Sequence, residues 1–470
     1  MRVLHGKDVR QLEDFDQNWA KRDFVQDVLD YINSKLNKVM IISGLRGTGK
    51  TVGMYQATLQ TNALYLCCEY GENNSAADYI RTIEEAGAST IIIDEHTWIK
   101  GRDTAKFERH LDSFVSKGKR IILTGTESAS LEALSRKDLI HRTVRRHVTH
   151  FSFEEYKRLY SETKSMRPQD VYDSYLKTGG VFQNYISNTA HGLDDYIQNS
   201  IVDNLYSYIG SKALPREKVA AAVYTVLFEA IHDTLNVKPP HEVFTAKSLE
   251  KLSNMGIIDI NDPLDPSVVQ ETGKILEEIG VIIKVPNIIP REQNKYFERG
   301  VSDDNRLYIV NQSMSWQFIN SIFGNVKDEK RILGRLFECA TMCELYYHKH
   351  PEDDLYFYEG MNGEIDAVIA PHTGDSPIYF FEAKHRFEIS DSNIQKGTWT
   401  ILTEKADKEI ATRFPNNDIC RYFVYTGSQQ HKKKDDKEFL LVGLDDKLYE
   451  YWNYEENKRD ITEKEFVPQI

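Results

Sequence analysis

The sequence contains no run of about 18 apolar residues, the length that a membrane-spanning helix needs. Its N-terminal segment, MRVLHGKDVRQLEDF, lacks the apolar centre of a signal peptide. Cysteine is scarce and forms no CxxC pair, the five positions being Cys67, Cys68, Cys339, Cys343 and Cys420. We therefore expect a cytoplasmic protein without a membrane partner, whose cysteines are reduced core residues rather than disulfides or metal ligands.

Basic residues are outnumbered by acidic ones, and the net charge of −13 argues against a surface covered by nucleic acid. One basic face remains compatible with this charge, because affinity for phosphates is set locally. A hydrophobic content of 40% and a charged content of 28% are typical of a globular protein. The 470 residues are too many for a single hydrophobic core, so we expect two to four domains.

The residue pattern changes three times along the chain. Apolar runs alternate with helix-length polar segments in residues 1–150, which predicts a parallel sheet covered by helices. Residues 151–214 are rich in tyrosine and read as a helical lid or linker. Residues 215–326 carry two helix patterns and then two strand patterns, as in a winged helix, and residues 327–470 read as a second α/β unit. The expected fold class is therefore α/β, with a P-loop sheet, a helical and winged-helix-like middle and a C-terminal α/β domain.

The predicted winged helix is poorly suited to reading DNA. Its second helix pattern begins with Asp265 as the N-cap and Pro266 in the first turn, and it ends at Gly280. This helix carries Glu271, Glu277 and Glu278 against the single Lys274. Because acidic side chains repel phosphates, we expect a packing or interdomain role instead.

A glycine-rich motif follows the first strand pattern. The segment GLRGTGKT matches G-x-x-x-x-G-K-[ST] and contains Gly44, Gly47, Gly49, Lys50 and Thr51. Glycines let backbone N–H groups surround phosphate oxygens, the lysine reaches the terminal phosphates, and the threonine hydroxyl binds Mg²⁺. The motif predicts a site for ATP and Mg²⁺.

Two carboxylates end a later strand pattern, STIIIDEH. We expect Asp94 to hold the Mg²⁺ through water and Glu95 to activate the water that attacks the γ-phosphate. The next strand pattern, RIILTGTES, offers Thr124 or Thr126 as a hydrogen-bond donor to the γ-phosphate or the water, although a threonine at a strand end is often only a cap.

These motifs, with THFSFEEY and TGGVFQNY, resemble in their order the bacterial and archaeal ATPases of the AAA/STAND-like class. The resemblance implies a P-loop domain, a helical or winged-helix middle and a C-terminal domain. It also implies that an arginine among Arg142, Arg145 and Arg146 contacts a phosphate, without saying which. The sequence departs from the class at Gly179-Gly180-Val181-Phe182, where a proline is usual, so that loop's nucleotide contact is not carried over.

A second polar motif lies in the last quarter of the chain. Asp366 ends one short strand pattern within GEIDAVIA, and Glu382 and Lys384 lie in the next strand pattern, IYFFEAK. Residues two apart on a strand face the same side, and a hairpin brings Asp366 beside them. Two carboxylates and an ammonium predict a Mg²⁺ or Mn²⁺ site for phosphoryl chemistry.

This second motif resembles the PD-(D/E)xK restriction-endonuclease-like superfamily. The resemblance implies an additional acidic residue on the preceding helix, where Glu338 would be a further metal ligand. It also implies a glutamine on the following helix, where Gln395 fits. Glu338 lies off the apolar stripe of its helix, so a solvated glutamate is an equal alternative.

The combined expectation is an ATPase that controls a nuclease-like domain acting on DNA, in defence or genome maintenance, with a protein partner or self-association as further possibilities. DNA contact is expected at Lys384, His385 and Arg386 and at HKKKDDK, residues 431–437, although the latter pattern is more often only a solvated loop. One alternative is an ATPase switch whose last domain is an inactive binding module. Another is a remodelling ring of AAA subunits, for which the sequence shows no clear arginine-finger motif.

Overall fold

The computed structural model covers residues 1–470. It describes residues 1–13, 15–68, 75–99, 104–125, 142–180, 192–209, 214–235, 253, 264–289, 305–323, 328–350, 352–360, 363–372, 377–388, 406–427, 430–434, 437–444 and 448. None of the helices in these segments is long and apolar enough to cross a membrane.

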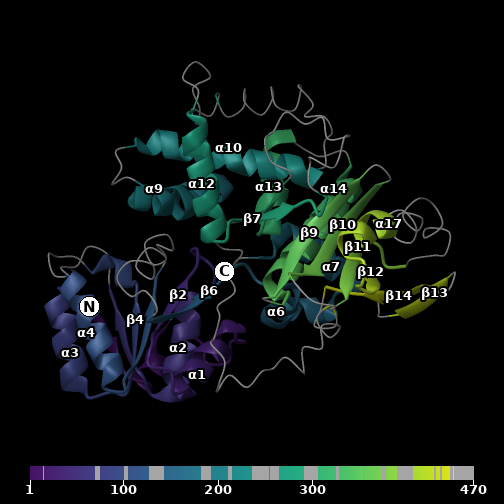
Figure 1. Ribbon diagram of the computed structural model, residues 1–470. Coiled ribbons are helices and arrows are strands. Elements are labelled where there is room, and N and C mark those ends of the chain that lie inside the picture. The colour runs from purple at the N-terminus through teal and green to yellow at the C-terminus, as the bar shows by residue number, and fades with distance from the viewer. Residues whose placement is uncertain are drawn as a thin grey trace.

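The N-terminal part of the chain forms a six-stranded sheet in the order β1-β3-β4-β5-β2-β6 (Figure 1). All its pairings are parallel except that of β1 with β3, which confirms the predicted parallel sheet. The strands are β1 (Arg2–Leu4), β2 (Val39–Ser43), β3 (Leu64–Cys67), β4 (Thr90–Asp94), β5 (Arg120–Thr124) and β6 (Thr143–His147). The helices are α1 (Phe24–Asn33), α2 (Lys50–Thr61), α3 (Ala76–Ala86) and α4 (Thr104–Ser116).

Strand β2 is buried on both faces, which explains its unbroken apolar sequence. Val39 and Ile41 enter one hydrophobic cluster, together with Phe107 of α4. Met40 and Ile42 point to the other face and enter a second cluster, with residues of α1 and α2. The sheet is therefore a central layer between two helical layers. This packing fixes the end of β2, where the glycine-rich loop begins.

Helices dominate the middle of the chain, with one antiparallel strand pair, β7 and β8. The elements are α6 (Phe153–Leu159), α7 (Pro168–Thr178), α8 (Gly192–Tyr196), α9 (Asp203–Ile209), α10 (Arg216–Leu235), α12 (Pro266–Glu278), β7 (Ile282–Pro286), β8 (Asn305–Ile309) and α13 (Gln312–Phe323). As predicted, Asp265 caps α12 by accepting a hydrogen bond from the Ser267 N–H at 2.8 Å. The other predicted winged-helix helix, at residues 246–256, lies outside the described residues except for Ser253.

The C-terminal part forms a second six-stranded sheet, in the order β13-β14-β12-β11-β10-β9. Its elements are α14 (Glu329–His348), β9 (Asp353–Gly360), β10 (Gly363–Pro371), β11 (Ile378–Lys384), α17 (Ala406–Arg413), β12 (Ile419–Tyr425), β13 (Gln430–Lys434) and β14 (Lys437–Val442). Strands β9, β10 and β11 are antiparallel neighbours, whereas β12 runs parallel to β11 and β14 parallel to β12. Helix α14 packs against β10 and β11.

The expectation of a solvated loop at residues 431–437 is wrong. Residues 430–434 form β13, which pairs antiparallel with β14, and β14 in turn pairs with β12. Strand β13 lies at the edge of the sheet.

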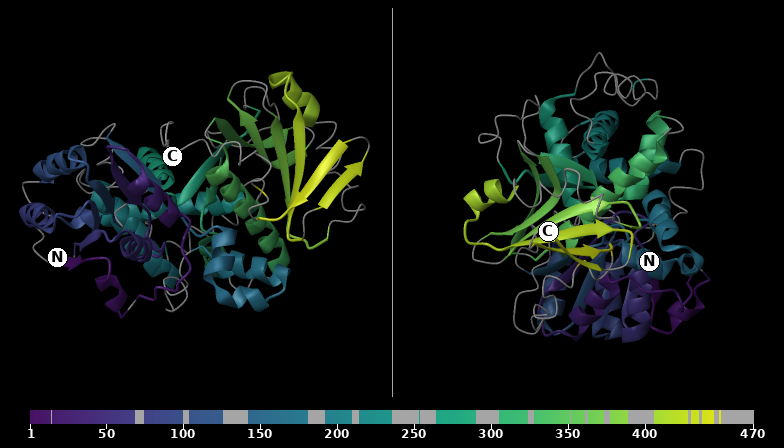
Figure 2. Two further views of the ribbon diagram at one scale, coloured as in Figure 1. Left: turned by 90° about the horizontal axis from the view of Figure 1, so that it is seen from below. Right: turned by 90° about the vertical axis from the view of Figure 1, so that its right-hand side faces the viewer.

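One continuous hydrophobic cluster joins the middle of the chain to the second sheet. It runs from Leu176 of α7 through α10, β7 and α14 to Val424 of β12. It also includes Leu45, which belongs to the glycine-rich loop after β2. The predicted segments 151–214, 215–326 and 327–470 therefore share a core, and this core reaches the N-terminal sheet at the glycine-rich loop. The left view of Figure 2 shows the two sheets toward opposite ends of the molecule, and Figure 1 shows α9, α10 and α12 above the N-terminal sheet.

Candidate functional site

The glycine-rich loop has the geometry of an anion-binding cradle. It joins β2 to the first turn of α2, where free backbone N–H groups and the helix dipole attract negative charge. Gly47 and Gly49 adopt φ angles of 79° and 81°, which other residues reach only under strain. A side chain at Gly44 would place its Cβ 2.3 Å from the Val148 carbonyl oxygen. The glycines predicted from the motif are therefore required by the backbone itself.

Lys50 is buried at the start of α2 and folds back over its own loop. Its Nζ donates hydrogen bonds to the carbonyl oxygens of Gly44 and Leu45, the second at 2.7 Å. Burial lowers the pKa of Lys50 to about 8, while the nearby carboxylates of Glu95 and Asp94 act to raise it. A phosphate bound in the loop would favour the charged ammonium and raise this pKa again.

Thr51 and Asp94 meet at the C-terminal edge of the sheet, as the two motifs predict. The Thr51 hydroxyl donates to Asp94 Oδ2 at 2.9 Å, and the Glu95 N–H donates to Asp94 Oδ1 at 3.0 Å. A third donor, the Tyr65 hydroxyl on β3, reaches Asp94 Oδ2 at 2.6 Å and was missed in the sequence. Hydroxyl and carboxylate oxygens are suited to Mg²⁺, so Thr51 and Asp94 fit the ion that the motif implies.

Glu95 and Thr124 flank Asp94 at the same edge. Glu95 has a φ of 52°, a left-handed conformation that costs about 1–3 kcal/mol in a residue other than glycine and is often found at functional sites. Thr124 ends β5, which lies between β2 and β4, and its buried Oγ1 has no hydrogen-bond partner among the described residues. The other predicted threonine, Thr126, lies outside the described residues.

The three arginines expected near the nucleotide lie on or beside β6. Arg142 forms an ion pair with Asp112 of α4, and Arg146 forms one with Asp27 of α1 at 2.7 Å. Arg145 lies between them along the strand. Two of the three candidates are thus engaged within the N-terminal domain, and a phosphate contact by any of them stays a prediction.

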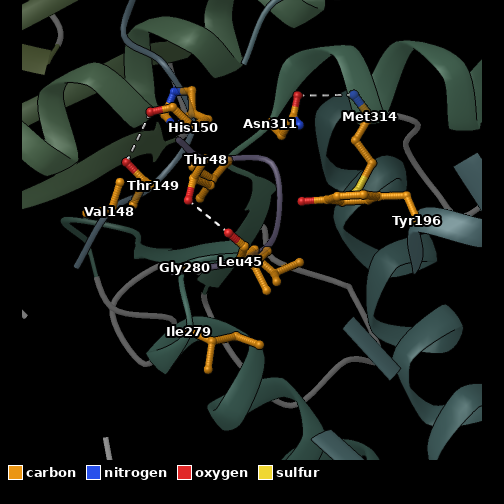
Figure 3. A pocket seen from close by; sticks show the side chains of 12 residues that line it. Leu45, Thr48, Val148, Thr149, His150, Tyr196, Ile279, Gly280, Asn311 and Met314 are labelled. Atoms are coloured by element: carbon orange, nitrogen blue, oxygen red, sulfur yellow. Dashed lines mark hydrogen bonds between the residues drawn. The ribbon is translucent and has the colours of Figure 1, made fainter. Parts of the chain in front are cut away.

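A small pocket lies between the glycine-rich loop and the middle of the chain (Figure 3). The Tyr196 hydroxyl points toward the loop and donates to the Arg46 carbonyl oxygen at 3.3 Å. His150 is buried beside it, and burial lowers the pKa of His150 to about 3, so its ring is neutral. The pocket is lined by Leu45, Thr48, Val148, Thr149, His150, Tyr196, Ile279, Gly280, Val281, Val310, Asn311 and Met314. The outer face of the loop therefore contacts the helices and strands that follow the N-terminal sheet.

The second predicted site is assembled by the antiparallel pair β10 and β11. Ala367 pairs with Phe381, and one residue beyond this pair lie Asp366 and Glu382. The Ala383 N–H donates to Asp366 Oδ2 at 2.8 Å, and Lys384 Nζ donates to Glu382 Oε1 at 2.5 Å. The structure thus brings the three predicted side chains together, with Asp366 in the middle of its strand rather than at its end.

The carboxylates of this site share a single buried environment. Burial, together with the neighbouring Asp366 charge, raises the pKa of Glu382 to about 8. Burial and Asp366 likewise raise the pKa of Glu338 to about 7. Burial acts to lower the pKa of Lys384, but the carboxylates of Glu382 and Asp366 outweigh it and leave this pKa raised. Lys384 therefore remains charged, and the carboxylates around it compete for ionisation.

Glu338 is half-buried and lies near enough to Asp366 and Lys384 for their charges to affect its pKa. It lies on α14, where Arg335 Nη1 donates to its Oε2 at 2.5 Å. Arg335 is close enough to Asp366 for the two charges to affect each other's pKa. Arg335 was missed because an arginine one turn before a glutamate looks like an ordinary surface pair. Gln395, the other residue implied by the resemblance, lies outside the described residues.

Two observations bear on a metal at this second site. Glu382 Oε2 is buried and has no hydrogen-bond partner among the described residues, as expected for an oxygen that can accept a cation. Among the same residues, however, no three His, Cys, Asp or Glu side chains are arranged to hold a metal ion. The donor types fit Mg²⁺ or Mn²⁺, and Glu382 offers Oε2 while its Oε1 is bonded to Lys384.

Comparisons with known proteins identify the first site. Residues 36–157 match the family model described as an AAA domain, so this part of the chain is an AAA-type P-loop ATPase domain. No curated protein matches the sequence.

Solved structures resemble the chain only distantly. The Saccharomyces cerevisiae Hsp104-ADP complex matches at a TM-score of 0.27 and 12% identity, over 59% of this chain and 40% of that one. Caenorhabditis elegans PCH-2 matches at a TM-score of 0.27 and 14% identity, over 59% of this chain and 74% of that one. A STAND ATPase with a tetratricopeptide repeat sensor from Pyrococcus horikoshii matches at 0.25 and 12%, over 72% and 48%. The chain thus spans less than half of the Hsp104 chain. The second half of the present chain is described by its own helices and strands.

Proposed function

We propose that the protein binds and hydrolyses ATP and uses the nucleotide to control its C-terminal domain. The observation that supports hydrolysis is the convergence of Thr51, Asp94 and Lys50 at one strand edge, with Glu95 beside them. Thr51 and Asp94 would hold Mg²⁺, Lys50 would bind the terminal phosphates, and Glu95 would orient the attacking water. Thr124, buried without a partner, is placed to donate to that water or to the γ-phosphate.

We further propose that the C-terminal domain, residues 327–470, is a metal-dependent nuclease acting on DNA. The support is the arrangement of Asp366, Glu382 and Lys384 across an antiparallel strand pair, with a parallel strand beyond and α14 packed against it. Mg²⁺ or Mn²⁺, when bound, would supply Lewis-acid polarisation of a phosphodiester oxygen. Asp366 and Glu382 would hold it, Glu338 would add a third carboxylate, and Lys384 would orient a water or stabilise charge on the phosphate.

The proposed control rests on the shared core. Residues 1–150 would form the nucleotide-binding domain, and residues 151–214 and 215–326 would transmit its state to the last domain, because one hydrophobic cluster runs from Leu45 to β12. The acidic face of α12 suits this packing role better than DNA reading. DNA contact is proposed near Lys384, His385 and Arg386, and self-association remains part of the proposal.

A second function is favoured by two observations. Lys384 is already neutralised by Glu382, and no group of three metal-binding side chains forms among the described residues. In this alternative the last domain binds a partner without cutting it, and the ATPase acts as a switch.

A cleavage assay with and without ATP separates these functions. We expect Lys50→Ala to lower ATP hydrolysis by about a hundredfold or more. We expect Lys384→Ala to abolish Mg²⁺- or Mn²⁺-dependent cleavage of labelled DNA while ATP hydrolysis continues. Lys330→Ala, which alters an exposed lysine on α14, is the matched control and should behave as wild type. Unchanged hydrolysis in the Lys50 variant would refute the ATPase, whereas intact DNA in every wild-type reaction would favour the binding module.

A further inference from the structure

We propose that Arg22 is a positioning residue for the glycine-rich loop and that Glu155 holds it in place. This inference rests on the proposed binding of ATP by that loop. Arg22 lies just before α1, outside every motif that the sequence analysis singled out. Its side chain is 8% exposed, and its guanidinium spans the space between the loop, the segment after β6 and the start of α6.

All the N–H groups of the Arg22 guanidinium donate hydrogen bonds. Nη1 donates to the Thr48 carbonyl oxygen at 2.6 Å and to the Thr149 carbonyl oxygen at 3.0 Å. Nη2 donates to the His150 carbonyl oxygen at 3.0 Å. Nε and Nη2 also form a two-pronged ion pair with Glu155, at 3.0 and 2.6 Å. The planar fork of an arginine can make these bonds together, and a lysine cannot.

Glu155 is fixed just as firmly. Its carboxylate accepts a hydrogen bond from the Asp23 N–H at 2.9 Å and one from the Ser152 N–H at 3.2 Å, and the latter completes the capping box of α6. Burial alone would raise the pKa of Glu155, but the Arg22 charge and these hydrogen bonds lower it to about 2. The pair is therefore ionised at neutral pH, and it forms a rigid brace.

The brace acts on the phosphate cradle through one peptide unit. The Thr48 carbonyl and the Gly49 N–H belong to the same planar, trans peptide group, so they point in opposite directions. Because Arg22 holds the carbonyl on the outer side of the loop, the Gly49 N–H is turned to the inner side, where a phosphate binds. Gly49, with a φ of 81°, permits this orientation. Arg22 thus fixes a phosphate donor without touching the nucleotide.

A purely structural role would explain these contacts less well. Burying an ion pair costs desolvation energy, and a packed apolar pair often stabilises a protein as well or better. What an apolar pair cannot supply is a donor for the Thr48 carbonyl. The contact to the loop is the part of the arrangement that requires an arginine.

The test compares Arg22→Lys with Arg158→Gln. Arg158 also joins α6 to the start of α1, by donating to the Lys21 carbonyl oxygen and to Asp23 Oδ1, and both of these acceptors lie outside the glycine-rich loop. We expect Arg22→Lys to raise the Kd of a fluorescent ATP analogue about tenfold, the effect of losing a charged hydrogen bond, and to speed hydrogen exchange in residues 44–51. Arg158→Gln should leave both quantities within twofold of wild type.

Stability is measured in parallel, and the Kd is read well below the melting temperature, so that a fall in stability alone cannot imitate the effect. Glu155→Gln serves as a second variant, because its amide group would face the guanidinium, displace Arg22 and raise the Kd in the same direction. The inference would be overturned if folded Arg22→Lys and Glu155→Gln bound the ATP analogue with the wild-type Kd. It would also be overturned if Arg158→Gln raised this Kd as much as Arg22→Lys does. If Lys50→Ala abolishes binding while Arg22→Lys keeps the wild-type Kd, only the positioning role fails; if wild type binds no ATP, the proposed function fails with it.

Discussion

At the scale of single residues, two buried carboxylates show opposite behaviour. Glu155 has all its partners, and Arg22 together with hydrogen bonds holds its pKa at about 2 despite burial. Glu382 has one bonded oxygen and one unpartnered buried oxygen among the described residues, and burial beside Asp366 raises its pKa to about 8. The first arrangement stabilises an ionised pair. The second leaves one buried oxygen of Glu382 available to bind a ligand, and functional sites often contain such groups.

The raised pKa of Glu382 predicts a pH-dependent loss of stability. In the unfolded chain Glu382 ionises near its ordinary value of 4.5, whereas in the folded protein it ionises near pH 8. Folding therefore favours the protonated form, and stability falls as the pH rises from about 4.5 to 8. We expect Glu382→Gln to remove part of this slope and to be more stable than wild type at pH 8 by the order of 1–3 kcal/mol. Thermal unfolding from pH 5 to 9 measures this difference.

Two controls sharpen that measurement. Glu352→Gln alters an exposed glutamate of the same domain and should follow the wild-type curve. Added Mg²⁺ should stabilise wild type above pH 7 and leave Glu382→Gln unaffected, because a cation favours the ionised carboxylate. Equal pH profiles for wild type and Glu382→Gln would contradict the raised pKa, and an absent Mg²⁺ effect would favour the binding module.

At the scale of elements, the sequence predicts those segments whose pattern reflects a local cause. The apolar runs of β2, β4 and β5, the Asp265 cap of α12 and the β10–β11 pair all follow from period, capping or turn chemistry. Helix α10 was missed because it is buried on most sides and shows little periodicity. Strand β13 was missed because its lysines hide a backbone pairing with β14.

Contacts between distant segments lie beyond a single sequence for a different reason. Arg22 and Glu155 are separated by 133 positions, and Tyr65 reaches Asp94 from a neighbouring strand. No local pattern encodes either pair, because each depends on the order of strands in the sheet and on the path of the chain after β6. The same holds for Arg335, whose role depends on how α14 is turned against β10.

The turn after α12 offers a test of how the middle of the chain packs on the nucleotide domain. Gly280 has a φ of 71°, and a Cβ there would lie 2.4 Å from His147 Nε2, on β6. We expect Gly280→Ala to destabilise the protein by about 1–3 kcal/mol, through backbone strain and the displaced contact. Differential scanning calorimetry measures the effect.

Gly273, which lies on α12 itself, provides the matched control. An added Cβ there would meet Val226 Cγ2 at 3.9 Å, an ordinary contact, so Gly273→Ala should be neutral or stabilise the helix by up to about 1 kcal/mol. Equal changes in stability for the two substitutions would show that the turn does not contact β6 as closely as it does in the structure.

At the scale of the whole molecule, helices α6 and α7 connect the two sites. The Phe153 N–H at the start of α6 donates to Glu344 of α14 at 3.0 Å, and α14 carries Glu338 and Arg335. On α7, Asp173 forms an ion pair with His385 at 2.9 Å, next to Lys384. Since the Arg22–Glu155 pair joins α6 to the glycine-rich loop, a continuous set of contacts runs from the loop to the second site.

This connection predicts that Asp173→Asn uncouples the sites. The substitution removes the charge that holds His385, while the contacts of the nucleotide site are left in place. We expect ATP hydrolysis to stay within about twofold of wild type, because Asp173 touches no residue of that site. The response of residues 384–388 to ATP should be lost, and hydrogen exchange of this segment with and without an ATP analogue measures it whether or not the domain cleaves DNA.

Asp170→Asn is the control for that experiment, because Asp170 lies one turn earlier on α7 and forms its ion pair with the exposed Arg167 instead of with His385. It should retain the wild-type response. A full ATP response in Asp173→Asn would show that the nucleotide state reaches the second sheet by another route, for example through Leu45 and the shared core. An ATP response that is absent from wild type as well would refute the proposed control, since a contact between the two sites is useful for regulation only if the glycine-rich loop changes its state on binding the nucleotide.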